Sequence, residues 1–104
     1  MKGINRVIVA GNLGQAPELQ VSKKGVNYSR LRVATEKFSL IEGEWQKSTN
    51  WHSIFVFGKK AEICQKYLAK GAAVAVEGYM DSGSEHPKIV AEDIHFFDPQ
   101  TAKT

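Results

Sequence analysis

Only one stretch of this sequence, residues 60–68 (KAEICQKYL), has the spacing of an amphipathic helix, and this limits the fold more than any other feature. The segment is followed by a basic residue and a glycine, Lys70 and Gly71, as is usual where a helix ends. The predicted buried face of this helix carries Ala61, Cys64, Tyr67 and Leu68. A chain with one short helix must build its core mainly from strands.

The other apolar segments are short, rich in β-branched residues and bounded by glycine or polar turns, which is typical of strands. Residues 36–48 lack a clean period, so we expect a long, mobile hairpin connection there. Residues 81–87 are expected to form a short polar turn. The predicted strands cover residues 5–10 (resuming at 18–21 after a bend), 27–34, 50–57, 73–80 and 88–97.

This order of elements, with the single helix between the third and fourth strands, predicts an all-β fold. It is the order of the OB-fold, a five-stranded Greek-key barrel whose sheet face and loops bind oligonucleotides and oligosaccharides. The chain has 104 residues, enough for one domain. We expect that domain to cover residues 1–98, followed by a short flexible tail over residues 99–104.

The composition argues against several classes of function. The sequence contains no HExxH, Walker or GxGxxG pattern, and its one cysteine and three histidines show no ligand spacing. We therefore expect no enzyme activity, no metal site and no cofactor. The sequence also contains no long apolar segment that could act as a membrane span or signal peptide, so we expect a cytoplasmic protein. The net charge of +3 weakly favours a polyanionic partner.

The aromatic residues suggest what that partner is. Trp51, Phe55 and Phe57 share one face of the third strand, whereas Ile54 and Val56 share the other and suit a barrel interior. Bases of a single strand stack on such exposed aromatic side chains. The alternatives are a reversed parity, or a row covered by the helix or by a second subunit.

Two further aromatic residues, Phe38 and Trp45, lie in the long connection. Lysines stand close to the aromatic segments: Lys37 beside Phe38, Lys47 near Trp45, and Lys59 just after the third strand. This interleaving of cations with aromatic rings is what a groove for single-stranded nucleic acid needs. Arg32 adds a cation from the second strand.

Several blocks in order resemble bacterial single-stranded-DNA-binding proteins, over about residues 4–80. They are residues 5–14 (NRVIVAGNLG), 33–35 (VAT), 49–62 (TNWHSIFVFGKKAE), 67–71 (YLAKG) and 76–78 (VEG). The resemblance implies an OB-fold that binds single-stranded DNA without sequence preference and usually assembles as a homotetramer. It also implies roles for single residues: stacking for Trp51 and Phe57, with Phe38 near a third stacking position; backbone contacts for Arg6, Lys59 and Lys70; and a structural or subunit-contact role for Asn5 and His52.

The sequence departs from that family in two places. The segment between the last two strands is short and has no tryptophan, leaving only Tyr79 nearby. The chain also ends without the acidic tip that the family usually carries, so we expect either a short member of the family without tail-mediated recruitment or a chain whose tail has been removed. In this it resembles primosomal replication protein N, a dimeric relative used in replication restart, and an origin in a phage or mobile element is a further reading.

The leading hypothesis is sequence-independent binding of single-stranded DNA in replication, recombination or repair. A homotetramer is expected, with a homodimer as the alternative and with replication or restart proteins as further partners. The competing hypothesis is a restart protein whose OB domain acts mainly through protein–protein contacts. A third is an OB domain that binds RNA.

Overall fold

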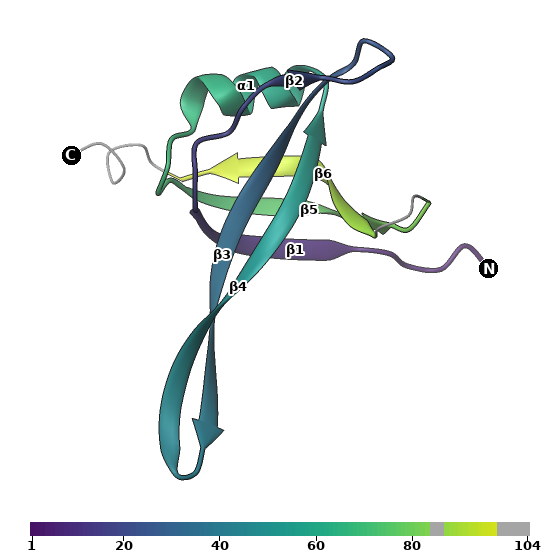
Figure 1. Ribbon diagram of the computed structural model, residues 1–104. Helices are drawn as coiled ribbons and strands as arrows, with labels where there is room; N and C mark the ends of the chain where they lie inside the picture. Colours follow the sequence, from purple (N-terminus) through teal and green to yellow (C-terminus); the bar gives the residue numbers. More distant parts are fainter. Residues whose placement is uncertain (84–86, 98–104) are drawn as a thin grey trace.

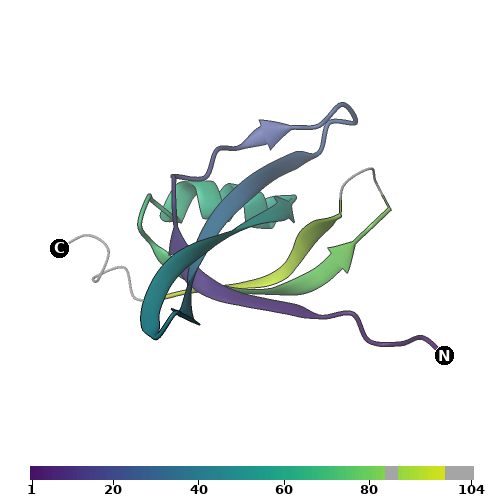
Figure 2. The same cartoon turned by 60° about the horizontal axis from the view of Figure 1, so that its bottom comes forward.

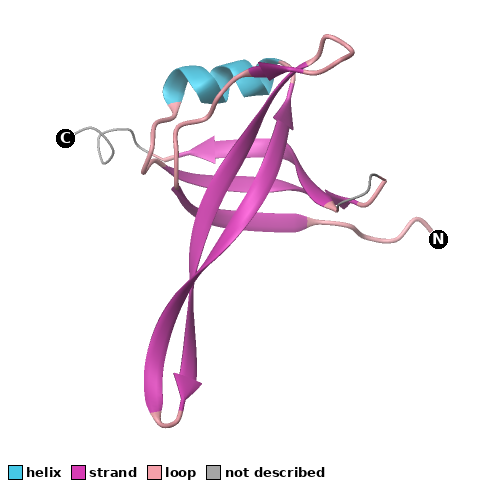
Figure 3. Cartoon of the chain, in the orientation of Figure 1, coloured by secondary structure: helices cyan, strands magenta, loops and turns pink. Residues whose placement is uncertain are grey.

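The computed structural model describes residues 1–83 and 87–97, and nearly all of its regular structure is β (Figures 1 and 3). Among these residues no helix is long and apolar enough to cross a membrane. In chain order the elements are β1 (Val7–Leu13), β2 (Gln20–Val21), β3 (Asn27–Ile41), β4 (Glu44–Phe57), α1 (Lys59–Tyr67), β5 (Ala73–Asp81) and β6 (Lys88–Phe96).

The strands close into a barrel. Their order in the sheet is β1-β5-β6-β4-β3-β2, and β1 also pairs with β3 through Asn12 opposite Ala34 and Leu13 opposite Val33. A side chain at Gly11 would overlap the carbonyl oxygen of Ala34, so glycine is needed where β1 crosses β3. Because β2 is only a two-residue segment beside β3, five long strands form the barrel. The helix follows the third of these, which confirms the predicted OB-fold.

The core is formed by alternate residues of the barrel strands. Leu31 and Val33 of β3, Val56 of β4, and Val74 and Val76 of β5 are all fully or almost fully buried. Such alternation follows from the two-residue period of a strand, which directs every second side chain inward. Strong burial on only one face of β3 and β4 leaves the opposite face of both strands free for a ligand.

The helix covers the core with Ala61 and Cys64, as predicted, but Tyr67 is 63% exposed. The prediction for Tyr67 was wrong because it lies six residues after Ala61, which places it about 120° away around the helix. Leu68 is buried, although it follows the last helical residue in an extended conformation.

The largest difference from the prediction is in residues 36–48. Instead of a loop, β3 and β4 continue past the barrel as one antiparallel ribbon, which projects downwards in Figure 1 and towards the viewer in Figure 2. The ribbon turns at Glu42 and Gly43, whose φ angles are 51° and 83°. Two consecutive residues with positive φ are characteristic of the tight hairpin turn that matches strand twist. Neither face of the ribbon is covered by the barrel, so no hydrophobic alternation revealed these strands.

The β5–β6 hairpin closes the opposite side of the barrel. Gly78 lies next to a bulge, where an added side chain would overlap the carbonyl oxygen of Val90. Part of the expected turn over residues 81–87, namely residues 84–86, lies outside the described residues, as does the expected tail over residues 99–104.

Candidate nucleic-acid interface

The outer face of β3 and β4 carries a series of aromatic side chains. Directly opposite residues of an antiparallel pair lie on the same face, and the β3–β4 register is unbroken from Tyr28 opposite Phe57 to Ile41 opposite Glu44. Ile54 and Val56 are fully buried, so the odd-numbered residues of β4 face outwards and the reversed parity is excluded. We call this series the aromatic strip: Tyr28, Phe38, Trp45, Trp51, Phe55 and Phe57.

Three rings of the strip form a cluster on the barrel. The centroids of Tyr28 and Phe57 are 6.1 Å apart, and Phe55 lies 6.4 Å from each of them, nearly parallel to Phe57 at 18°. The ammonium of Lys88 lies 5.4 Å from the Phe55 centroid and 5.9 Å from that of Phe57. Lys88 reaches the cluster because β6 runs parallel to β4 in the sheet. The cluster therefore combines flat apolar surface with a cation.

Trp51 occupies the middle of the strip, where its side chain is 50% exposed. The guanidinium carbon of Arg32 lies 5.2 Å from the indole centroid. The indole also lies close to the backbone of Gly14, where an added side chain would overlap the ring. These two contacts position the ring while leaving half of its surface accessible.

The ribbon carries the far end of the strip. Phe38 is 59% exposed and Trp45 is 71% exposed, and Trp45 lies opposite Leu40. The ammonium of Lys47 lies 3.3 Å from a carboxylate oxygen of Glu36 at the surface. Such an exposed pair contributes little stability, so Lys47 remains available to a phosphate.

The structure places the other predicted cations around the strip rather than on it. Lys59 begins α1, two residues after Phe57. Arg6 precedes β1, and Lys70 lies beside Gly71, whose N–H donates to the carbonyl of Leu13 at the other end of β1. Arg6 and Lys70 are therefore at opposite ends of one strand. Both are exposed, so their proposed phosphate contacts stay predictions.

The two predicted subunit-contact residues both have partners within the chain. The side-chain amide of Asn5 donates to the carbonyl of Met80 at 2.7 Å, and its oxygen accepts from the Met80 N–H at 3.0 Å. Nε2 of His52 lies 2.8 Å from the hydroxyl of Thr35. These contacts give both residues a structural role, and a role at an interface stays a prediction.

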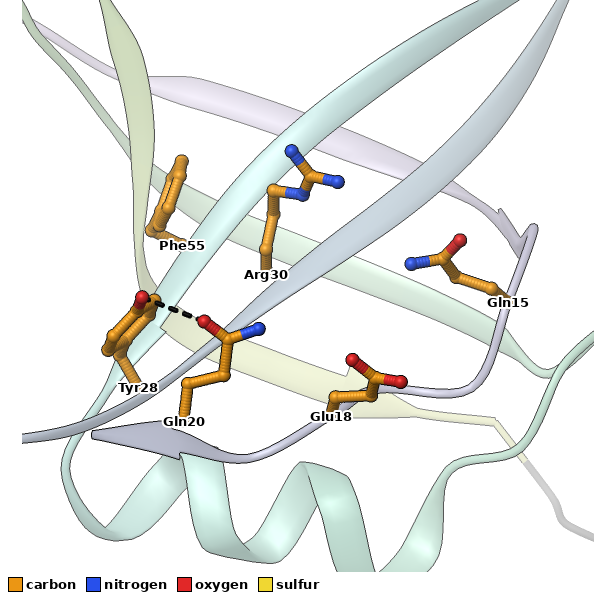
Figure 4. Close-up of a pocket in the computed structure, with 6 residues that line it drawn as sticks. All are labelled: Gln15, Glu18, Gln20, Tyr28, Arg30 and Phe55. Carbon is orange, nitrogen blue, oxygen red and sulfur yellow. Dashed lines mark hydrogen bonds between the residues drawn. The ribbon is translucent and has the colours of Figure 1, made fainter. Parts of the chain in front are cut away.

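A groove of about 300 Å³ lies beside the aromatic cluster, between the segment joining β1 to β2 and the outer face of β3 and β4 (Figure 4). The sequence patterns did not predict Tyr28, Arg30 or Lys88 as members of the site. The first two would have followed from the hairpin register, whereas Lys88 depends on a pairing between distant strands. The residues that line the groove are Gln15, Glu18, Gln20, Tyr28, Arg30 and Phe55.

In residues 1–83 and 87–97, no three His, Cys, Asp or Glu side chains are close enough to hold a metal ion. Burial raises the pKa of the Cys64 thiol to about 11, so it stays protonated at neutral pH. The arrangement is suited to binding through rings and cations.

The chain was compared with protein families and with solved structures, and both comparisons find single-strand binding proteins. The Single-strand binding protein family matches residues 4–96. The fold is similar to that of Plasmodium falciparum SSB in complex with ssDNA, at a TM-score of 0.78 and 24% identity, covering 94% of this chain and 98% of that one. It is also similar to a deletion mutant of the single-stranded DNA binding protein from Thermus aquaticus, at a TM-score of 0.77 and 24% identity. That match covers 92% of this chain and 51% of the Thermus chain, so this chain spans about half its length.

Proposed function

Since this chain belongs to the single-strand binding protein family, we propose that it binds single-stranded DNA along the aromatic strip. Residues 1–98 are the binding domain in this proposal. Its solved structural neighbours include a protein in complex with single-stranded DNA, which supports the same partner here. The processes it serves are replication, recombination or repair of DNA.

The observation that carries this proposal is the exposure of the strip itself. Trp51 and Trp45 are half or more exposed, although an exposed row of large apolar rings is costly unless a partner covers it. Phe57 and Trp45 lie twelve residues apart on β4, which corresponds to about 40 Å of strand. That length suits a single strand of several nucleotides, within the roughly 4–16 nucleotides that one OB domain covers.

In the proposed mechanism, cations capture the strand and rings hold it. Arg32 and Lys88 lie over rings of the strip, so a base stacked there brings its phosphates close to a positive charge. Arg6, Lys59 and Lys70 extend the positive surface around the barrel. Binding through phosphates releases counterions, so affinity falls as salt rises.

We also propose that the chain assembles with itself, as a homotetramer or a homodimer. Among residues 1–83 and 87–97, β1 pairs between Val7 and Gly11 only with β5, on one side, and its residue Ile8 is 64% exposed. An unpaired strand edge beside an exposed apolar side chain is a ready site for adding a strand from a second copy. Contacts with replication or restart proteins would use surfaces that remain after assembly.

One observation favours the second candidate function, a restart protein that acts through protein contacts. On the ribbon, Leu40 and Trp45 share one face, while Ile41 is 47% exposed on the other. A strand stacked on one face leaves the other apolar face uncovered. This candidate predicts that replacing Trp51 changes the oligomeric state and leaves DNA affinity unaltered.

The test is a competition measured by fluorescence anisotropy of a labelled oligothymidylate. Unlabelled single-stranded DNA should displace the label far better than duplex DNA of equal length, and direct binding of the label should weaken as salt is raised. An RNA of the same sequence distinguishes DNA from RNA preference. Equal competition by duplex and single strand would refute the proposed function.

A further inference from the structure

The groove beside the aromatic cluster differs chemically from the rest of the strip. Its far wall is formed by Tyr28, Arg30 and Phe55 on β3 and β4, and its near wall by polar side chains from the segment before and within β2 (Figure 4). Its volume of about 300 Å³ is at the lower end of the range for small-ligand pockets, which suits one base rather than a larger group. The aromatic wall offers a stacking surface at its side.

The unusual member of the groove is Glu18. Its side chain is exposed, and among the described residues it has no hydrogen-bond or ion-pair partner. A carboxylate on a surface that receives a polyanion repels the phosphates. It becomes favourable only towards N–H donors, because an ionised carboxylate accepts hydrogen bonds and donates none.

The neighbouring polar groups complement this acceptor. The Tyr28 hydroxyl donates to Oε1 of Gln20 at 2.8 Å, which orients the Gln20 amide and leaves its N–H₂ free to donate. Figure 4 shows this nitrogen directed away from Tyr28, with Gln15 and Glu18 on the same side of the groove. The groove thus presents one carboxylate acceptor together with amide donors and the guanidinium of Arg30.

We propose that this groove is a base-recognition subsite that favours guanine, an inference that rests on the proposed function. It is a local preference at one position, while stacking along the rest of the strip stays independent of sequence. The Watson–Crick edge of guanine carries two adjacent donors, N1–H and N2–H₂, which match the two oxygens of Glu18. Its O6 then accepts from a glutamine amide, while the ring lies beside Phe55 and Tyr28. Thymine offers one N–H between two carbonyl oxygens, and adenine and cytosine each offer one amino group beside an acceptor nitrogen.

The experiment compares two oligonucleotides binding to the full chain at a salt concentration that keeps both affinities measurable. One is an oligothymidylate, and the other has single guanines separated by thymines, so that every register offers a guanine and no quadruplex forms. The variant is Glu18→Gln, and the matched control is Glu92→Gln, which removes an exposed charge on β6 outside the groove. Wild type and control should bind the guanine oligonucleotide about fivefold or more tightly, and Glu18→Gln should lose this preference.

Two outcomes would overturn the inference. They are an absence of preference in the wild type and a preference that survives Glu18→Gln. An equal gain of affinity for both oligonucleotides in that variant leaves their ratio unchanged, and would mean that Glu18 only repels phosphates. If neither oligonucleotide binds the wild type, the proposed function itself fails, whereas equal binding of both removes only the guanine preference.

Discussion

At the scale of single residues, the parity of β4 decides what the surface can do. The buried Ile54 and Val56 turn Trp51 and Phe57 outwards, and the contacts of Trp51 with Arg32 and Gly14 orient its ring. A pre-positioned ring loses little freedom when a base stacks on it, because its geometry is already restricted. A base stacked on Trp51 should therefore contribute close to the full free energy of one stacking contact.

Replacing Trp51 with alanine should weaken the binding of single-stranded DNA by about 1–3 kcal/mol, the value of one stacked base. Titration of a labelled oligothymidylate measures the change. The matched control is Tyr67→Ala, which removes an exposed aromatic ring on α1 away from the strip and should leave affinity unchanged. Unaltered affinity in the Trp51 variant would remove this residue from the site.

Cys64 allows a test of burial through pH. Its side chain is fully buried, and desolvation raises the thiol pKa from 9.0 to about 11. Above about pH 9 the unfolded chain loses this proton while the folded chain keeps it, so the free energy of unfolding falls as pH rises, by about 2–3 kcal/mol across the full window. Below pH 9 the thiol is neutral in both states and contributes no pH dependence.

Urea denaturation between about pH 8 and pH 10.5 measures this slope against the variant Cys64→Ala. The variant should be less stable at neutral pH because it leaves a small cavity, yet its stability should fall less steeply in alkali. Identical slopes in the two proteins would show that the thiol does not titrate differently on folding.

At the scale of elements, the hairpin shows both the reach and the limit of sequence reasoning. Alternation of apolar and polar residues predicted the barrel portions of β3 and β4 and the outward face of Trp51. The spacing of apolar residues over three to four positions predicted the helix, so all of these depended on local periodicity. The ribbon was missed because no core imposes a pattern on it. Glu42 is also an unusual residue at the first position of such a turn, where asparagine or aspartate is common.

Because this turn was not recognised in the sequence, the register of β3 and β4 and part of the site could not be predicted. Once Ile41 is placed opposite Glu44, every pair follows along the ladder, and Tyr28 and Arg30 come to lie beside the outward residues of β4. Lys88 could not be found in this way, because its contact with Phe55 depends on the pairing of β6 with β4 across the closed barrel. Local signals therefore predicted the shared face of Trp51, Phe55 and Phe57, whereas the hairpin register adds Tyr28 and the pairing of distant strands adds Lys88.

Gly43→Ala should loosen the ribbon and spare the barrel. A side chain at a φ of 83° costs about 1–2 kcal/mol, and the ribbon beyond the barrel has no core contacts that share this cost. Hydrogen exchange of ribbon amides should accelerate by about 5–30-fold, while the melting temperature and the exchange of β5 amides stay as in the wild type. A large drop in melting temperature would instead mean that the ribbon folds as one unit with the barrel.

At the scale of the whole molecule, the exposed edge of β1 is where we expect a second copy of the chain to pair. Ile8→Glu should reduce the oligomer to smaller species, because assembly through this edge would bury an unpaired charge. Sedimentation equilibrium measures the mass. Val21→Glu places the same charge on β2, where Val21 is 65% exposed, and should keep the wild-type mass. The same mass for all three proteins would exclude β1 from the interface.

Stacking of single-stranded DNA on the aromatic strip is the central proposal for the whole molecule. The chain has only two tryptophans and both belong to the strip, so the variant Trp45→Phe leaves Trp51 as the one tryptophan emitter. The decisive measurement is a titration of this emission with oligothymidylate and with duplex DNA at low and high salt. The account predicts strong quenching by the single strand, weakened by salt, and little quenching by the duplex. An emission that neither DNA changes would contradict it and would make the strip a surface for protein contacts.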